Sequence, residues 1–250
     1  MIVYFSGTGN SRAVAKTLAG LLDEKVSFIF PAPDLSGEER VIWVTPVYSW
    51  GLPPVMVDAI RSAVCKKGSR HFLVATHGDD LGNTHRQWRR IISEKGLDPV
   101  AAYSVTMPNT YVSLPFFDVD SPEVEKAKLE AMPRRVDEIA LMIRGEKRCD
   151  DVVRGAFPGF KSSVIYPVFI RKALSAKPFR VNDRCTSCHK CERECPMQNI
   201  TFTDGRPVWH DNCAGCLGCY HICPVHAIDR GSATRHKGQY YYPAHHHQGK

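Results

Sequence analysis

Short apolar runs alternate with segments of helical periodicity through the first 145 residues. Apolar runs, several of them rich in β-branched residues, predict five strands at residues 2–6, 26–30, 41–47, 72–76 and 100–107. Apolar positions at helical spacing predict helices at residues 11–22, 54–64, 83–95 and 123–144. Strands that alternate with helices are typical of a parallel sheet covered on both faces. This part of the chain therefore predicts an α/β fold with a doubly wound sheet of five parallel strands.

The pattern changes after residue 145. Between residues 144 and 180 there are nine Lys or Arg against three Asp or Glu, and prolines interrupt the segment. An apolar stretch within residues 163–174 predicts one helix. We interpret it as a connecting helix that packs two units together. An element that docks on a membrane surface or on a partner is the alternative.

The next segment is rich in cysteine. Eight of the ten cysteines form two copies of C-x₂-C-x₂-C-x₃-C-P, offset by 28 residues. Three cysteines within seven residues let one loop surround a face of a cuboidal iron–sulfur cluster. A structural zinc site needs only paired C-x₂-C knuckles, so zinc is the weaker alternative. The candidate ligands are Cys185, Cys188, Cys191, Cys195, Cys213, Cys216, Cys219 and Cys223.

This repeat resembles the bacterial-type ferredoxins with two [4Fe-4S] clusters. In those proteins the fourth cysteine of each repeat ligates the other cluster. The resemblance implies one cluster held by Cys185, Cys188, Cys191 and Cys223, and another held by Cys213, Cys216, Cys219 and Cys195. We interpret the nearby His189, His210, His221 and His226 as solvated surface residues, and we assign no role to Cys65 and Cys149.

A loop with the sequence SGTGNS follows the first predicted strand and precedes the first helix. Backbone N–H groups at a helix N-terminus favour an anion, and three hydroxyl groups add further donors. The loop is neither a Walker A motif nor a complete G-x-G-x-x-G motif. A turn with Asn10 or Ser11 as an ordinary helix cap is the alternative. The candidate binding residues are Ser6, Gly7, Thr8, Gly9, Asn10 and Ser11.

At this position the loop resembles the FMN phosphate loop of flavodoxins. The resemblance implies FMN, the strand order 2-1-3-4-5 and two more loops that hold the flavin ring. The candidates for these loops are Pro46, Tyr48, Trp50 and Gly51 after the third strand, and His77, Gly78, Asp79 and Gly82 after the fourth. Tyr48 or Trp50 would stack on the ring, although packing within the protein is the alternative for each.

Charge and hydropathy exclude several function classes. The formal net charge is +7 with cysteine counted as neutral. Eight thiolates, two clusters and a flavin phosphate would bring it to about +1, so we interpret the basic balance as cofactor compensation and expect no nucleic-acid partner. No apolar run is long enough to span a bilayer, and the start has no signal-peptide pattern. We therefore expect a cytoplasmic protein with reduced cysteines.

As a whole the chain resembles flavodoxin–ferredoxin fusion proteins of anaerobic metabolism. The resemblance implies an FMN domain at residues 1–145, a connecting segment at 146–180, a small α+β ferredoxin-like domain at 181–232 and a tail at 233–250, which we expect to be mobile. It implies electron transfer between FMN, the clusters and a redox protein partner. An FMN-dependent reductase of a small molecule and a ferredoxin with a flavin-free docking domain are the alternatives. No catalytic residue stands out.

Overall fold

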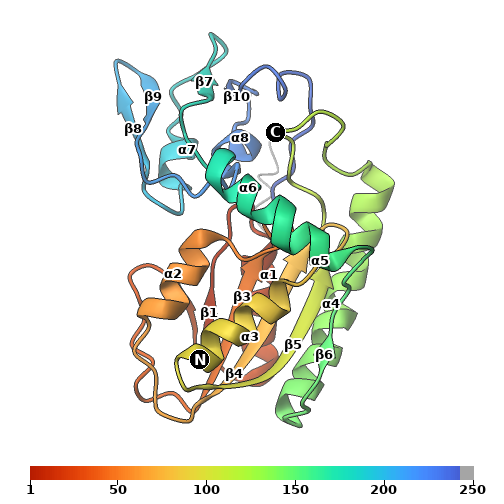
Figure 1. Cartoon of the computed structure of the whole chain (residues 1–250). Coiled ribbons are helices and arrows are strands. Elements are labelled where there is room, and N and C mark those ends of the chain that lie inside the picture. The colour runs from red at the N-terminus through yellow and green to blue at the C-terminus, as the bar shows by residue number, and fades with distance from the viewer. Residues whose placement is uncertain (243–250) are drawn as a thin grey trace.

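The computed structural model of the chain describes residues 1–242. An α/β unit and a cysteine-rich unit are joined by a helix that crosses between them (Figure 1). The sheet of the α/β unit contains β1 (Ile2–Tyr4), β2 (Val26–Phe28), β3 (Arg40–Pro46), β4 (Arg70–His77), β5 (Asp98–Thr106) and β6 (Asp150–Asp151). Its helices are α1 (Asn10–Leu22), α2 (Pro54–Ser62), α3 (Thr84–Glu94) and α4 (Pro122–Arg144). The histidines at residues 245–247 lie outside the described residues.

All six strands of this sheet run parallel, in the order β2-β1-β3-β4-β5-β6. The first five strands have the order expected for a flavodoxin-like doubly wound sheet, so the predicted fold class is confirmed. The short edge strand β6 is an addition that the apolar pattern did not predict, because it consists of Asp150 and Asp151. Arg89 and Arg135 form ion pairs with these two carboxylates and hold the strand against β5.

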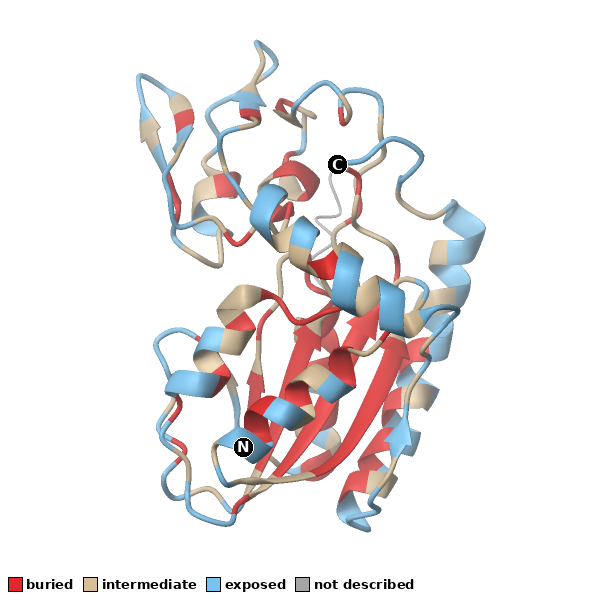
Figure 2. Cartoon of the chain, in the orientation of Figure 1, coloured by how far each residue is buried: buried red, intermediate tan, exposed pale blue. Residues whose placement is uncertain are grey.

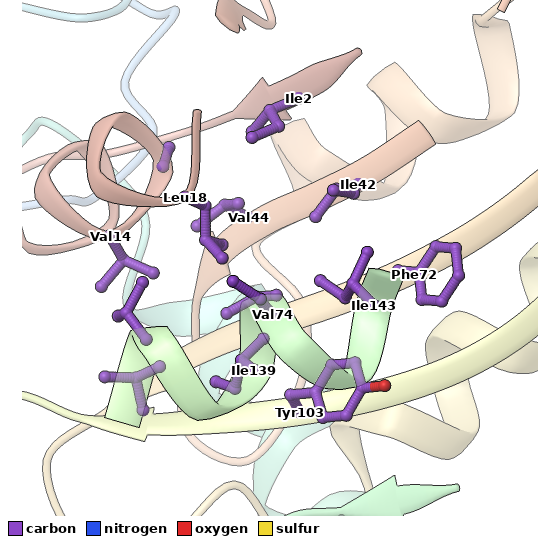
Figure 3. Close-up of a cluster of buried hydrophobic side chains, with 14 of the residues drawn as sticks. Ile2, Val14, Leu18, Ile42, Val44, Phe72, Val74, Tyr103, Ile139 and Ile143 are labelled. Carbon is purple, nitrogen blue, oxygen red and sulfur yellow. The ribbon is translucent and has the colours of Figure 1, made fainter. Parts of the chain in front are cut away.

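Helices cover both faces of the sheet with separate apolar cores. Between one face and helices α1 and α4 lies a buried cluster that includes Val14, Val44 and Ile139 (Figure 3). Between the other face and helices α2 and α3 lies a second cluster, which includes Trp43 and Trp88. The sheet is red along most of its length in Figure 2, because its strands are buried on both sides. This rigid layer positions the loops that leave the carboxyl ends of the strands.

A buried polar pair lies inside the second core. The indole Nε1 of Trp43 donates a hydrogen bond of 3.0 Å to Nδ1 of His71, and Nε2 of His71 lies 2.9 Å from the hydroxyl of Ser69. Because Nδ1 accepts, the proton of the neutral ring is on Nε2. His71 has no exposed surface, and burial lowers its pKa to about 4. The folded protein therefore keeps this histidine neutral.

Replacing His71 with asparagine is expected to make the protein less sensitive to acid. Between pH 6.5 and about pH 4 the folded state binds fewer protons at His71 than the unfolded state does. The free energy of unfolding therefore falls as the pH decreases through this window, by up to about 3 kcal/mol from this residue. The midpoint of thermal unfolding, measured anaerobically at about pH 7 and about pH 5.5, reports this loss. The loss should be smaller in His71→Asn and unchanged in His210→Asn, whose side chain is exposed; equal losses in all three proteins would contradict the assignment.

The cysteine-rich unit is a small α+β arrangement, as expected. Its elements are β7 (Phe179–Val181), α7 (Lys190–Arg193), β8 (Ile200–Thr203), β9 (Arg206–Trp209), α8 (Gly218–Ile222) and β10 (Ile228–Arg230). Two antiparallel pairs, β7 with β10 and β8 with β9, enclose the cysteine loops. The buried apolar residues include Phe179, Ile200 and Ile228, and most of the eight cysteines pack against or within this cluster. So small a core makes the stability of the unit dependent on what the cysteines bind.

The connecting segment forms one continuous helix with a wider turn in its middle. It consists of α5 (Pro158–Phe160), the π-helical turn η1 (Lys161–Ile165) and α6 (Tyr166–Lys172). The sequence placed this helix at residues 163–174, so the observed helix starts five residues earlier and contains the turn in its interior. Within residues 1–242, no helix is both long and apolar enough to cross a membrane.

Candidate functional site

The eight motif cysteines gather around two cavities in the cysteine-rich unit. The lining of one cavity includes Cys185, Cys188, Cys191 and Cys223. The lining of the other includes Cys195, Cys213, Cys216 and Cys219. Each repeat thus contributes three cysteines to one cavity and its last cysteine to the other. The grouping is the crossed one that the resemblance implied.

The donor set of these cavities fits iron–sulfur clusters. Each cavity is lined by four cysteines, and thiolates are the preferred ligands of iron–sulfur clusters. Structural zinc sites also use four thiolates, so the assignment to iron rests on the C-x₂-C-x₂-C-x₃-C-P spacing of the two repeats.

Burial makes two of these thiols poor acids in the metal-free chain. Burial raises the pKa of Cys191 and of Cys216 to about 12. At neutral pH both would be protonated in the metal-free chain. Iron binding must therefore displace these protons, and its positive charge stabilises the thiolates in the low-dielectric interior. The apolar surroundings also keep water away from the sulfur atoms.

The first loop enters helix α1 without a side-chain cap. The N-cap is Gly9, with φ 96°, and no side chain accepts a hydrogen bond from the first turn. Asn10 and Ser11 instead belong to the helix and tie it to the sheet. Nδ2 of Asn10 donates to the carbonyl oxygen of Pro108 at 3.0 Å, and the hydroxyl of Ser11 lies 2.7 Å from that of Thr76. The interpretation of Asn10 or Ser11 as a cap is therefore wrong, and the N–H groups of the first turn have no side-chain acceptor.

Within the loop, Ser6 holds the turn by accepting a hydrogen bond of 3.1 Å from the N–H of Gly9. Several polar atoms nearby are buried and have no hydrogen-bond partner among residues 1–242. They are Nη2 of Arg12, the hydroxyl of Tyr48 and both ring nitrogens of His77. Burial lowers the pKa of His77 to about 4 and raises the pKa of Tyr48 well above its usual value. Unused donors around an uncapped helix start fit a polar anionic ligand such as FMN.

The loop after β3 places its two aromatic residues, Tyr48 and Trp50, in different parts of the protein. Tyr48 and Gly51 exchange two backbone hydrogen bonds around Ser49 and Trp50, which both have positive φ. This tight turn begins two residues after Pro46, the last residue of β3. Tyr48 packs in the same apolar cluster as Cys216. The indole ring of Trp50 lies against Nζ of Lys161 from the connecting helix, 5.0 Å from the ring centre. Of the two, Tyr48 lies nearer the cysteine-rich unit.

The residues of the loop after β4 also lie in different surroundings from one another. His77 is buried at the end of the strand, whereas Asp79 is exposed. A methyl group added to Gly78 would collide with Asn109, and one added to Gly82 would lie 2.8 Å from Cβ of Trp50. The glycines thus permit close approach, as expected, but to neighbouring loops of the protein. The structure brings His77 and Gly78 toward residues 108–110, and Gly82 toward Trp50.

The first loop and the second cysteine repeat are in direct contact. A methyl group added to Gly7 would lie 2.5 Å from Cβ and 3.1 Å from Sγ of Cys216. A methyl group added to Gly218 would lie 2.6 Å from the carbonyl oxygen of Gly7. Ala214 is buried in the apolar core of the α/β unit. The candidate phosphate loop and one candidate cluster cavity therefore share a wall.

His221 strengthens this contact and is not the solvated residue that we expected. It is buried, its Nε2 donates to the carbonyl oxygen of Thr110 at 2.8 Å, and its Nδ1 accepts from the N–H of Tyr240 at 3.2 Å. One ring thus joins the cysteine-rich unit, the loop after β5 and the tail. Its position in α8, between two cysteines, gave no signal of this role.

The end of the described chain packs across the first loop. Tyr240 donates a hydrogen bond of 2.7 Å to Oδ1 of Asn10, and the N–H of Tyr242 donates to the carbonyl oxygen of Thr8 at 2.8 Å. A methyl group added to Gly9 would lie 2.5 Å from Cβ of Tyr242. The expectation of a mobile tail is wrong for residues 240–242. Three consecutive tyrosines were the only signal in the sequence.

The connecting helix is fastened to the loop after β3 by Tyr166. Its hydroxyl donates to the carbonyl oxygen of Leu52 at 2.6 Å and lies 3.2 Å from Nε2 of Gln87. The hydroxyl of Ser162 donates to the carbonyl oxygen of Trp50 at 2.7 Å and lies 2.8 Å from the N–H of Asn83. The helix therefore covers both candidate flavin loops.

Replacing Tyr166 with phenylalanine is expected to destabilise the protein by about 1–2 kcal/mol, because a buried carbonyl oxygen and an amide lose their partner. Tyr111→Phe is the matched control, since the Tyr111 hydroxyl makes no hydrogen bond in the described chain and its loss should cost less than about 0.5 kcal/mol. Denaturant titration of both variants measures the difference. Equal losses would show that the helix is not held by this hydroxyl.

Comparison with known proteins finds relatives of the cysteine-rich segment and a solved structure similar to the first part of the chain. Residues 184–228 match the 4Fe-4S dicluster domain family. Ferredoxin-2 of Chlorobaculum tepidum is 39% identical over 56 residues, which are 20% of this chain and 90% of the relative. Pyruvate synthase subunit PorD of Methanocaldococcus jannaschii is 34% identical over 56 residues, 22% of this chain and 65% of the relative. General stress protein 14 of Treponema denticola, solved in complex with FMN, is similar at 12% identity and a TM-score of 0.40, over 58% of this chain and 98% of that one.

Proposed function

The chain belongs to the 4Fe-4S dicluster ferredoxin family through its residues 184–228, and we propose that it is an electron carrier that links FMN to two [4Fe-4S] clusters. The observation that carries the proposal is the contact between Gly7 of the first loop and Cys216 of the second repeat. A flavodoxin-like unit whose phosphate loop touches a cluster ligand needs no further protein between the two redox groups.

The chain's own residues would hold each group. One cluster would be ligated by Cys185, Cys188, Cys191 and Cys223, and the other by Cys195, Cys213, Cys216 and Cys219. The backbone and hydroxyl groups of residues 6–11 would bind the FMN phosphate, with Tyr48 and His77 beside the ring. When bound, FMN exchanges two electrons and each cluster passes one. Burial at the shared wall excludes water from the path between them.

The surroundings of the flavin loops support a carrier over a reductase of small molecules. The connecting helix packs on Trp50 and on the turn around Gly51, and residues 240–242 pack on the first loop. These contacts restrict the access of a free substrate to the flavin loops. A partner protein that accepts electrons at a cluster does not need that access. One curated relative is named as a subunit of pyruvate synthase, which supports a protein as the partner.

Anaerobic purification with iron, acid-labile sulfide and flavin quantified per chain tests this function. The proposal expects about eight iron, about eight sulfide and about one FMN. Stoichiometric reduction of the flavin should then be followed by bleaching of the cluster absorbance within the same molecule, independent of protein concentration. Full iron without FMN, and without stabilisation by added FMN, would leave a ferredoxin with a docking domain and reject the flavin-to-cluster route. Bound zinc in place of iron would reject the proposal entirely.

A further inference from the structure

The outer face of the connecting helix is apolar and exposed. Phe157 and Phe160 are 79% and 60% exposed, and Val164 and Val168 are also exposed. These residues recur every three or four positions, so they form one stripe along α5, η1 and α6. Figure 2 shows exposed residues, in pale blue, at intervals along this helix. Monomeric proteins rarely expose a continuous apolar stripe without using it.

The helix cannot rotate to bury this stripe, because its opposite face is already bonded. Lys161 forms an ion pair of 2.6 Å with Asp80, and Tyr166 is buried with its hydroxyl on the carbonyl oxygen of Leu52. Breaking these contacts would leave the buried carbonyl oxygen of Leu52 without its partner and the carboxylate of Asp80 without its ion pair. The stripe therefore stays on the surface in the folded chain.

A second apolar element adjoins the helix. Phe116 is fully exposed with a positive φ of 68°, and Leu114 and Phe117 beside it are exposed too. Nζ of Lys237 binds the carbonyl oxygens of Leu114 and Phe117 and holds this loop in shape. The ring of Tyr111 packs edge-on against both Phe117 and Phe169 of α6. The loop tip and the helix are thus parts of one fixed surface.

Positive charge predominates along the segment that contains the connecting helix. Residues 152–182 contain six Lys or Arg and no Asp or Glu. Apart from Lys161, none of these cations forms an ion pair within the described part of the chain: Arg154, Arg171, Lys172, Lys177 and Arg180. Such a segment attracts an anionic surface, and the attraction is worth about 1 kcal/mol for each cation near anionic lipid.

We propose that this face docks the protein on an anionic lipid membrane. The connecting helix lies in the plane of the interface, Phe116, Phe157 and Phe160 enter the boundary between headgroups and acyl chains, and the cations contact the lipid phosphates. A protruding Phe116 that touches no pocket of its own fits a deformable medium, whereas a protein partner would need a preformed cavity for it. This goes beyond the proposed electron transfer and holds whether or not FMN is bound.

Flotation of the anaerobically purified full chain with lipid vesicles tests this proposal. The vesicles contain phosphatidylcholine alone or with one third phosphatidylglycerol, at about 0.1 M and about 1 M salt, where the screening length falls from about 10 Å to about 3 Å. The protein should float only with the anionic vesicles and only at the lower salt. Arg171→Gln with Lys172→Gln should weaken the partition about 30-fold. Phe116→Ser with Phe160→Ser should weaken it at least tenfold.

Matched controls change two cationic or two apolar residues elsewhere on the surface. Lys16→Gln with Lys67→Gln and Val64→Ser with Leu141→Ser alter exposed residues of the α/β unit and should leave flotation unchanged. Unchanged iron content and thermal midpoint show that each variant is folded. Absence of flotation of the unsubstituted protein, equal losses in the controls, or a dimer that Phe116→Ser with Phe160→Ser dissociates would each overturn the proposal. The last result would make a second copy of the chain the occupant of this surface.

Discussion

We expect about four iron atoms per chain in a protein that carries both Cys195→Ala and Cys216→Ala, as many as in either single variant. These two cysteines belong to different repeats, but they line the same cavity. If both ligate one cluster, the second substitution removes a ligand from a cluster that is already lost. Iron and sulfide analysis of the three variants, purified anaerobically, measures the effect.

The matched control combines Cys195→Ala with Cys188→Ala. These cysteines belong to the same repeat, and only Cys188 lines the other cavity. This double variant should lose both clusters and retain almost no iron. If the ligands were instead sequential within each repeat, the two double variants would exchange their results. The pair of experiments therefore tests the crossed ligation without a structure of the loaded protein.

Replacing Gly7 with alanine should destabilise the protein and lower its flavin content, whereas Gly20→Ala should not. The new methyl group at residue 7 would lie 2.5 Å from Cβ of Cys216, closer than two carbon atoms can approach. Forcing an extra methyl group into such a contact costs about 1–3 kcal/mol. At residue 20, in the interior of α1, nothing lies within 4 Å and alanine should stabilise the helix by up to about 1 kcal/mol.

Denaturant unfolding of the two glycine variants measures these opposite changes in stability, and flavin analysis measures how much flavin each variant retains. A loss of stability in Gly7→Ala with normal flavin content would mean that the contact is structural only. If Gly7→Ala were as stable as the unsubstituted protein, the two units would not be in contact in solution. That result would contradict the contact between the first loop and the second cysteine repeat.

The elements that the sequence predicts well are those in which one physical requirement sets the pattern. A parallel strand buried on both faces must be largely apolar, and β3 and β4 are apolar at residues 41–44 and 72–75. Three candidate ligands of each cluster lie on one short loop, which produces the C-x₂-C-x₂-C spacing. These features depend on neighbours in the chain.

The features that the sequence did not predict depend on contacts between distant segments. Asp150 and Asp151 form an edge strand only because Arg89 and Arg135 neutralise them. His221 is buried because Thr110 and Tyr240 supply its partners. Likewise, Trp50 lies beneath Lys161 because a helix more than a hundred residues later crosses over it. The spacing of apolar residues along the sequence does not predict contacts between such distant segments.

The position of residues 240–242 on the first loop also bears on how the chain is made. A ribosome releases the chain from its N-terminus, so residues 6–11 are complete long before Tyr240 leaves the exit tunnel. Until then nothing from the tail covers Thr8 or Gly9, and a phosphate-bearing ligand can reach the loop from that side.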